Sequence, residues 1–184
     1  IFVTYEALAF VDAASTPTQV AGAMARCEVA RRRLARWARS APANFASQRW
    51  LVEAELARLS GRRSSALRAY DRAIARARDD HRMTDLALAN ERAAAYQLEL
   101  GNERLSLAYL REAVFAYARW GASSKVDALV ALHPEAAATP TTARDSRTTQ
   151  ATSSERLDAA AVVRASQALS EQLVLDELVC TLVR

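Results

Sequence analysis

Apolar residues recur every three or four positions through most of this chain, which is the spacing of one face of an α-helix. The clearest case is WLVEAELARLSGRRSSALRAYDRAI, residues 50–74. One face carries Trp50, Ala54 and Ala57; a second carries Ala66, Tyr70, Ala73 and Ala77. Gly61 separates the two faces, at a place where a helix end favours a residue that adopts a left-handed conformation. The stretch therefore predicts two helices that meet at Gly61.

The same spacing predicts further helices on either side. We expect helices over residues 1–14, 17–40, 45–59, 63–78, 83–100, 103–120 and 123–132. In the first of them, we expect an apolar stripe made of Phe2, Tyr5, Leu8 and Ala9. Ser15-Thr16-Pro17 interrupts the pattern, and Thr16 or Thr18 is expected to cap the second helix. His133 and Pro134 end the last helix.

An internal repeat organises these helices. Gly61 and Gly101 are forty residues apart, and the residues around them match in size. The matched pairs are Ala54 with Ala94, Ala66 with Ser106, Tyr70 with Leu110, and Ala73 with Ala113. Neither helix of such a pair buries its apolar face alone, so the pairs must stack. The predicted fold is all-α: antiparallel, tetratricopeptide-like helix pairs stacked into a short right-handed solenoid, plus a separate C-terminal helix.

The pattern changes after residue 134. Residues 1–134 are predicted to form the helical-repeat domain, and residues 135–154, which contain no large apolar side chain, a flexible linker. Helical spacing returns over residues 155–184, which we interpret as a signalling or coiled-coil helix. Its expected dimer contacts are Leu157, Leu169, Leu173, Leu178 and Leu182.

The net charge of +4 comes from arginine, since Lys125 is the only lysine. We attribute the abundance of arginine and alanine first to GC-rich codons. The densest basic run is RRRLARWAR, residues 31–39. It is interpreted as a solvated helix face, and alternatively as a docking surface for an acidic partner or nucleic acid. The arginines concerned are Arg31, Arg32, Arg33, Arg36 and Arg39.

The sequence offers little catalytic chemistry. It contains no glycine-rich phosphate loop, and its two histidines and two cysteines have unrelated spacings, so we expect no cofactor, no metal site and no enzyme activity. Glu53 and Glu55 are expected on different helix faces, which argues against a catalytic carboxylate pair. Glu91 and Glu99 are expected to be solvated or paired with arginines such as Arg92. His81 and His133 are expected at the surface.

The cellular location of the protein and the extent of its chain can also be predicted. Cys27 and Cys180 lie far apart in the chain, which favours a reducing, cytoplasmic compartment without disulfides. The apolar runs are too short for a membrane span. Because the chain starts without Met and both ends have helical patterns, we expect it to be a piece of a longer protein.

The residues around Trp50, Gly61, Ala66, Tyr70 and Ala73 resemble a tetratricopeptide repeat. The second copy departs from that pattern, because Asn90 stands in place of the tryptophan and Leu110 in place of the aromatic residue. If a segment binds as it does in such repeats, it lies along the first helix of each pair. The candidate contact residues there are Arg49, Glu53, Asn90 and Gln97.

Longer stretches resemble the helical-repeat region of very large bacterial and fungal signalling proteins. They are NFASQRWLVEAELARLSGRRSSALRAYDRAIARAR, ALANERAAAYQLELGN, AYLREAVFAYARWGASSKVDALVALHP and LDAAAVVRASQALSEQLVLDELVCTLVR. Those proteins carry a serine/threonine-kinase-like domain, an AAA-type ATPase, these repeats, a GAF domain and a histidine kinase. The resemblance covers most of the chain from Asn44 onward, and implies a non-catalytic module that joins the ATP-binding module to the GAF sensor. It implies protein partners: neighbouring domains, or a second copy bound through residues 155–184. A ligand-sensing or nucleic-acid-binding regulatory domain is the alternative.

Overall fold

Helices follow one another through the whole described part of the chain. The computed structural model describes residues 2–137, so the predicted linker from residue 138 onward and the predicted dimer contacts Leu157, Leu169, Leu173, Leu178 and Leu182 lie outside the described residues. Seven α-helices and one short 3₁₀ turn make up this part, and residues 2–137 contain no strand. The elements are α1 (Phe2–Asp12), α2 (Pro17–Ser40), α3 (Pro42–Leu59), α4 (Arg63–Asp79), α5 (Met83–Glu99), α6 (Glu103–Trp120), α7 (Ser123–Leu132) and η1 (Pro134–Ala136).

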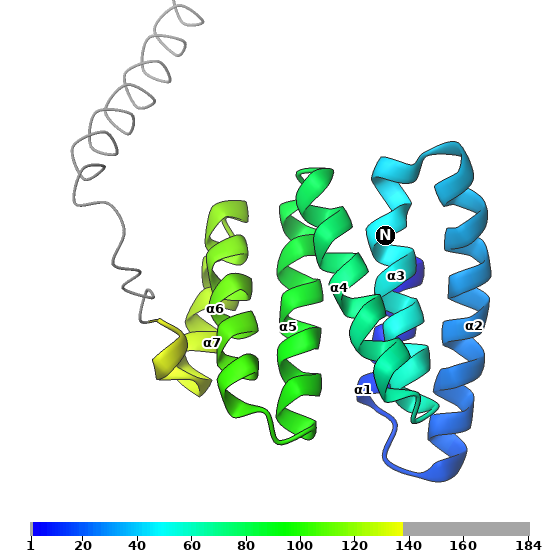
Figure 1. Cartoon of the computed structure of the whole chain (residues 1–184), viewed down its shortest axis with the longest axis horizontal. Coiled ribbons are helices and arrows are strands. Elements are labelled where there is room, and N and C mark those ends of the chain that lie inside the picture. The colour runs from blue at the N-terminus through cyan, green and yellow to red at the C-terminus, as the bar shows by residue number, and fades with distance from the viewer. Residues whose placement is uncertain (1, 138–184) are drawn as a thin grey trace, which may run out of the picture. The chain divides into compact units, whose positions relative to one another are not determined.

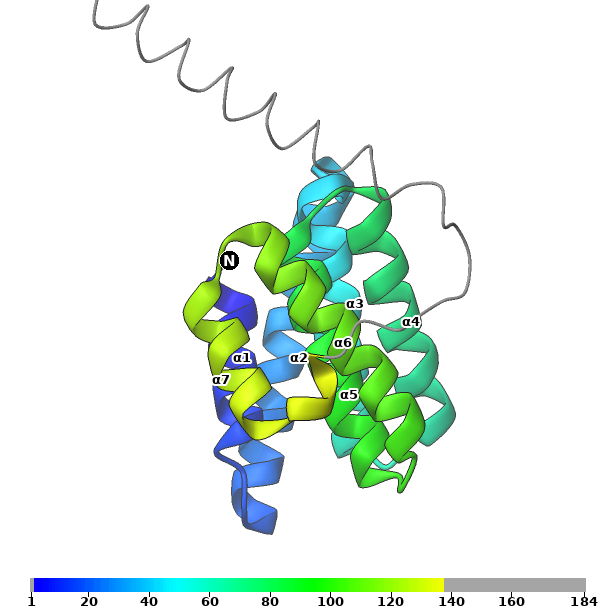
Figure 2. The same cartoon turned by 90° about the vertical axis from the view of Figure 1, so that its left-hand side faces the viewer.

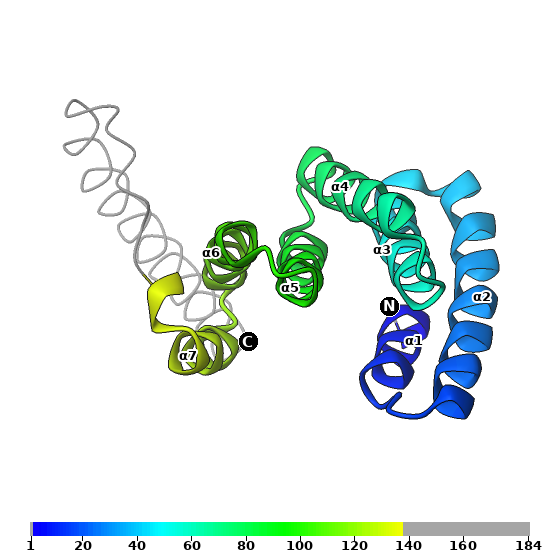
Figure 3. The ribbon, with the colours of Figure 1, turned by 60° about the horizontal axis from the view of Figure 1, so that its bottom comes forward.

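The helices stack in chain order (Figure 1), each packed against the one before it. In the oblique view of Figure 3, the helices form a curved row in which α1, α3, α5 and α7 alternate with α2, α4 and α6. Figures 2 and 3 both place α1 and α7 on the side of the row opposite to α4. The predicted all-helical fold with stacked neighbouring helices is confirmed.

Four successive turns share one geometry at a spacing of twenty residues. Gly61, His81, Gly101 and Gly121 have φ angles of 68°, 54°, 76° and 88°. In each turn the following residue donates its N–H to a carbonyl five positions back, as Arg62 does to Ala57 at 2.9 Å. This is the Schellman arrangement, which satisfies carbonyls at a helix C-terminus. Each forty-residue repeat therefore consists of two twenty-residue half-repeats that end in the same turn. His81 stands where the other three turns have glycine.

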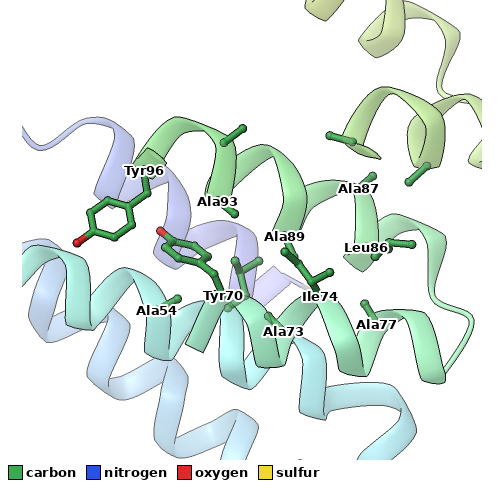
Figure 4. Close-up of a cluster of buried hydrophobic side chains, with 14 of the residues drawn as sticks. Ala54, Tyr70, Ala73, Ile74, Ala77, Leu86, Ala87, Ala89, Ala93 and Tyr96 are labelled. Carbon is green, nitrogen blue, oxygen red and sulfur yellow. The ribbon is translucent and has the colours of Figure 1, made fainter. Parts of the chain in front are cut away.

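The central core consists mainly of alanine around two tyrosines. Tyr70 of α4 and Tyr96 of α5 lie with ring centroids 5.7 Å apart (Figure 4), and alanines of α3, α4 and α5 surround them. Small side chains let helix backbones approach closely, and the aromatic rings fill the remaining volume. The predicted buried face of α4 is confirmed, because Ala66, Tyr70, Ala73 and Ala77 are all at most 2% exposed.

The stripe predicted for the first helix is wrong. Phe2 is 89% exposed, and Tyr5 and Ala9 are also exposed. The buried side of α1 instead carries Thr4, Ala7, Leu8 and Val11. Both sets have helical spacing, and the choice between them is made by the contacts of α1 with α2 and α3.

The folded region reaches slightly beyond the predicted domain boundary at residue 134. In η1, Ala136 is buried, and the guanidinium of Arg111 donates to the carbonyl of Glu135 from 3.0 Å. This turn contacts both α6 and α7. Glu135 and Ala136, assigned to the linker from sequence, are therefore packed against the helical domain.

Candidate protein-contact site

A buried carboxylate joins three helices at the centre of the stack. Glu55 of α3 has no exposed surface. Its carboxylate accepts hydrogen bonds of 2.8 Å from the Tyr70 hydroxyl, from Arg92 Nε and from the Arg58 guanidinium. Arg92 comes from α5 and Tyr70 from α4. We call these four residues the Glu55 network; because a buried carboxylate is costly without partners, its three donors hold the helices in one arrangement.

Two further carboxylates extend the Glu55 network to the surface. Arg92 also bonds Asp12, at the end of α1, and Arg58 donates to Glu99 of α5 at 2.7 and 3.0 Å. Glu91 and Glu99 were expected to be solvated or paired with arginines such as Arg92. Glu99 does pair with an arginine, Arg58, whereas Glu91 pairs with Lys125 and accepts from the Tyr117 hydroxyl. The guanidinium of Arg92 donates to Glu55 instead. No sequence pattern had placed Glu55 in a candidate site.

The surroundings fix the protonation states of the network donors. Burial, reinforced by the charge and hydrogen bond of Glu55, raises the pKa of Tyr70 well above its ordinary value. Burial alone would lower the pKa of Arg92, but its bonds to Glu55 and Asp12 more than offset that effect and raise it. Both groups therefore remain protonated donors at neutral pH.

A second buried polar cluster links the N-terminal halves of α1, α3 and α5. Asp85 of α5 accepts from Ser47 Oγ at 2.7 Å, from Gln48 Nε2 at 3.3 Å and from Arg82 Nε at 2.6 Å. Thr4 of α1 donates to Gln48 at 3.2 Å. Helix α1 is thus tied to the α3–α5 pair at both of its ends, by Thr4 here and by the bond of Asp12 to Arg92 of the Glu55 network.

Cys27 of α2 lies next to the Glu55 network. Its side chain has no exposed surface. Burial, followed by the nearby charge of Glu55, raises the pKa of the Cys27 thiol to about 11. Since the thiolate is the reactive form, the geometry describes a core thiol and not a nucleophile.

The predicted contact residues do not form one exposed surface. Asn90 is 1% exposed and donates to the Leu86 carbonyl, and Gln97 is 6% exposed and accepts from Asn102. Both are too deeply buried to contact a partner, because they occupy the core-facing positions of the twenty-residue half-repeat. Arg49 lies over the Trp50 ring at 4.8 Å, and Glu53 is 3.6 Å from Arg31.

No protein-family model, curated protein or solved structure matches this chain. The resemblance to large signalling proteins therefore stays a prediction. Within residues 2–137, no group of three or more metal-ligating side chains is placed to hold an ion. The helices of that same region include none with the length and apolar content to cross a membrane.

The basic run divides into two sets of arginines. Arg31 and Arg32 both donate to Glu28, at 2.8 and 2.7 Å, and these hydrogen bonds hold the Glu28 pKa down at about 2. Arg33, Arg36 and Arg39 are exposed and have no ion-pair partner among residues 2–137. Two of the five arginines are thus paired with an acidic side chain, and three are exposed without an ion-pair partner in the described stack.

Proposed function

We propose that this chain is a non-catalytic interaction and coupling module, which transmits contacts between the protein segments on either side of it. The supporting observation is that α1, at the start of the stack, is bonded to α5 at its centre. Asp12 reaches Arg92, and Arg92 reaches the buried Glu55. A change at α1 therefore alters the pairing of a buried charge, which is costly to leave unpaired.

The proposal includes a cellular setting and partners. A cytoplasmic signalling protein that contains an ATPase, a GAF domain and a histidine kinase would place this stack between its ATP-binding and sensor modules. The partners would be domains of the same chain or a second copy bound through residues 155–184. The main support for this setting is the sequence resemblance, and for a coupling role it is the Glu55 network.

Hydrogen exchange tests the coupling directly. The variant Asp12→Asn removes the charge that pairs with Arg92 and should increase amide exchange in α5 as well as in α1. The control is Glu6→Gln, because Glu6 lies on the same helix with similar exposure but pairs with Arg26 of α2. Glu6→Gln should affect only α1 and α2. If Asp12→Asn leaves α5 exchange unchanged, α1 is not coupled to the centre of the stack and the proposal fails.

A further inference from the structure

We propose that the exposed face of α2, with the groove between α1 and α2, binds an acidic amphipathic helix from a protein partner. This inference rests on the proposed interaction function and adds the chemistry of the partner. Three features of the surface carry it: a groove with an exposed valine at its edge, a row of arginines that have no ion-pair partner among residues 2–137, and a strip of small residues.

The groove has the size of a single side chain. Its lining is mostly polar: Glu6 and Arg26, which form an ion pair of 3.0 Å, and Arg33 lie beside Val3, Ala7, Val29 and Ala30, and its volume is about 120 Å³. A cavity of about 150 Å³ binds benzene, so a groove of this volume has room for one side chain. Val29 is 52% exposed at its edge, which leaves apolar surface for a partner to cover.

Positive charge that has no ion-pair partner within residues 2–137 begins at the groove and continues along α2. Arg33 lines the groove, and Arg36 and Arg39 follow at intervals of three residues on the exposed side. Arginine stays charged at every accessible pH and binds carboxylates through two parallel hydrogen bonds. A helix with acidic residues at matching intervals would pair with these side chains.

The other half of the α2 face permits close approach. Gly22 and Ala25 are exposed on the same side as Val29, and a Cβ added at Gly22 would meet no atom within 4 Å. Small residues let two helix backbones come near each other. In Figures 1 and 3, α2 lies at the edge of the described stack, with α1 and α3 on its inner side.

The same features favour a protein helix over nucleic acid. Exposed Val29 and the small-residue strip contribute nothing to phosphate binding, which depends on Lys and Arg charge. An acidic amphipathic helix uses them as well as the arginines, with an apolar side chain against Val29 at the groove edge and its carboxylates along α2.

The test measures fluorescence anisotropy of a synthetic peptide added to the full chain at about 0.15 M salt. The peptide has about 18 residues, with Leu at helical spacing and Glu elsewhere, so that it forms one amphipathic helix. A peptide of the same composition in scrambled order and a short DNA duplex are the comparison probes. Arg33→Gln/Arg36→Gln/Arg39→Gln should weaken binding of the patterned peptide by about tenfold or more. Each lost ion pair has a modest effect, and the triple variant removes three of them. Val29→Glu should weaken it as well.

The matched control is Arg62→Gln/Arg63→Gln/Arg68→Gln, which removes the same charge from exposed positions around α4 that form no ion pair in the described stack. It should leave the affinity within about twofold, and thermal melting checks that every variant is folded. Any of four outcomes would overturn the inference. They are equal weakening of peptide binding by both triple variants, equal affinity for the scrambled and the patterned peptide, higher affinity for the DNA duplex than for the patterned peptide, and no binding of the patterned peptide. None of these outcomes alters the hydrogen-exchange test of coupling, which concerns contacts inside the chain.

Discussion

At the residue scale, the decisive feature is one glutamate in an apolar setting. Leu51, Val52 and Ala54 precede Glu55 on α3, and all three are buried, as Glu55 is. Its position three residues before Arg58 gives a helical neighbour that is visible in sequence. The approach of Tyr70 and Arg92 is not visible there, because they come from other helices. Glu55 is therefore a buried ion whose partners only the stack provides.

We expect Glu55→Gln to destabilise the fold by about 3 kcal/mol, because it leaves two partly buried arginines without their shared anion. Arg92→Met should also destabilise it. The double variant should lose less than the sum of the two, by at least about 1 kcal/mol. Urea unfolding followed by circular dichroism measures these differences.

The control for this cycle is Glu53→Gln. Glu53 lies two residues away on the same helix, is 28% exposed and sits 3.6 Å from Arg31, so its loss should cost under about 1 kcal/mol. Equal effects at positions 53 and 55, or strict additivity of Glu55→Gln and Arg92→Met, would show that the Glu55 network is not a coupled unit.

Alkaline pH should act on Tyr70. Its folded-state pKa lies above its unfolded value of about 10, so its contribution to stability is complete below pH 10 and is lost as pH rises from there toward the folded-state pKa. Tyr70→Phe should cost about 1.5–3 kcal/mol at pH 7 by removing a bond to a charged group. Above pH 10 its stability should fall less steeply than that of the wild type.

Urea unfolding at several pH values between 8 and 11.5 follows the Tyr70 effect. Tyr109→Phe is the comparison, because Tyr109 also donates to a carboxylate, that of Asp71 at 3.2 Å, but in an exposed setting. Its slope above pH 10 should stay closer to that of the wild type. Parallel curves for Tyr70→Phe and the wild type would mean that Tyr70 ionises as freely in the folded protein as in the unfolded chain.

At the scale of the element, the twenty-residue half-repeat sets where helices end. Helices α4 to α7 begin at residues 63, 83, 103 and 123, each two residues after a left-handed residue. All four turns were predicted from sequence, since helices were expected to begin at residues 63, 83, 103 and 123. The left-handed conformation of His81 was not predicted, because glycine stands at this position in the other three turns and an L-residue adopts this conformation at a cost.

His81→Gly should therefore stabilise the protein, by about 1 kcal/mol, by relieving that cost. Gly101→Ala should destabilise it by a similar amount. Nothing lies within 4 Å of a Cβ added at Gly101, so the expected loss is conformational and not steric. Thermal unfolding of both variants checks the opposite signs. If His81→Gly lowers the melting temperature, an interaction of the imidazole outweighs the backbone effect.

At the scale of the whole molecule, one question concerns self-association. Under the proposed function residues 155–184 form the dimer contact, with Leu157, Leu169 and Leu173 among its apolar positions. We expect the chain of residues 1–184 to be a dimer and a chain ending at residue 154 to be a monomer. Light scattering on a sizing column measures both masses. Two dimers would instead place the interface on the helical stack, and two monomers would remove the dimer contact from the proposal.

The sequence by itself determined the helices, most of their ends and the face that α4 buries. These features depend on spacing and on backbone conformation, which act over a few residues. Tertiary structure decided which side of α1 is buried, that Asn90 and Gln97 face the core, and which arginines are neutralised. Burial and ion pairing depend on side chains from helices distant in sequence. The pairing of Glu55 with Arg92 across thirty-seven positions is the clearest case, because no local pattern encodes it.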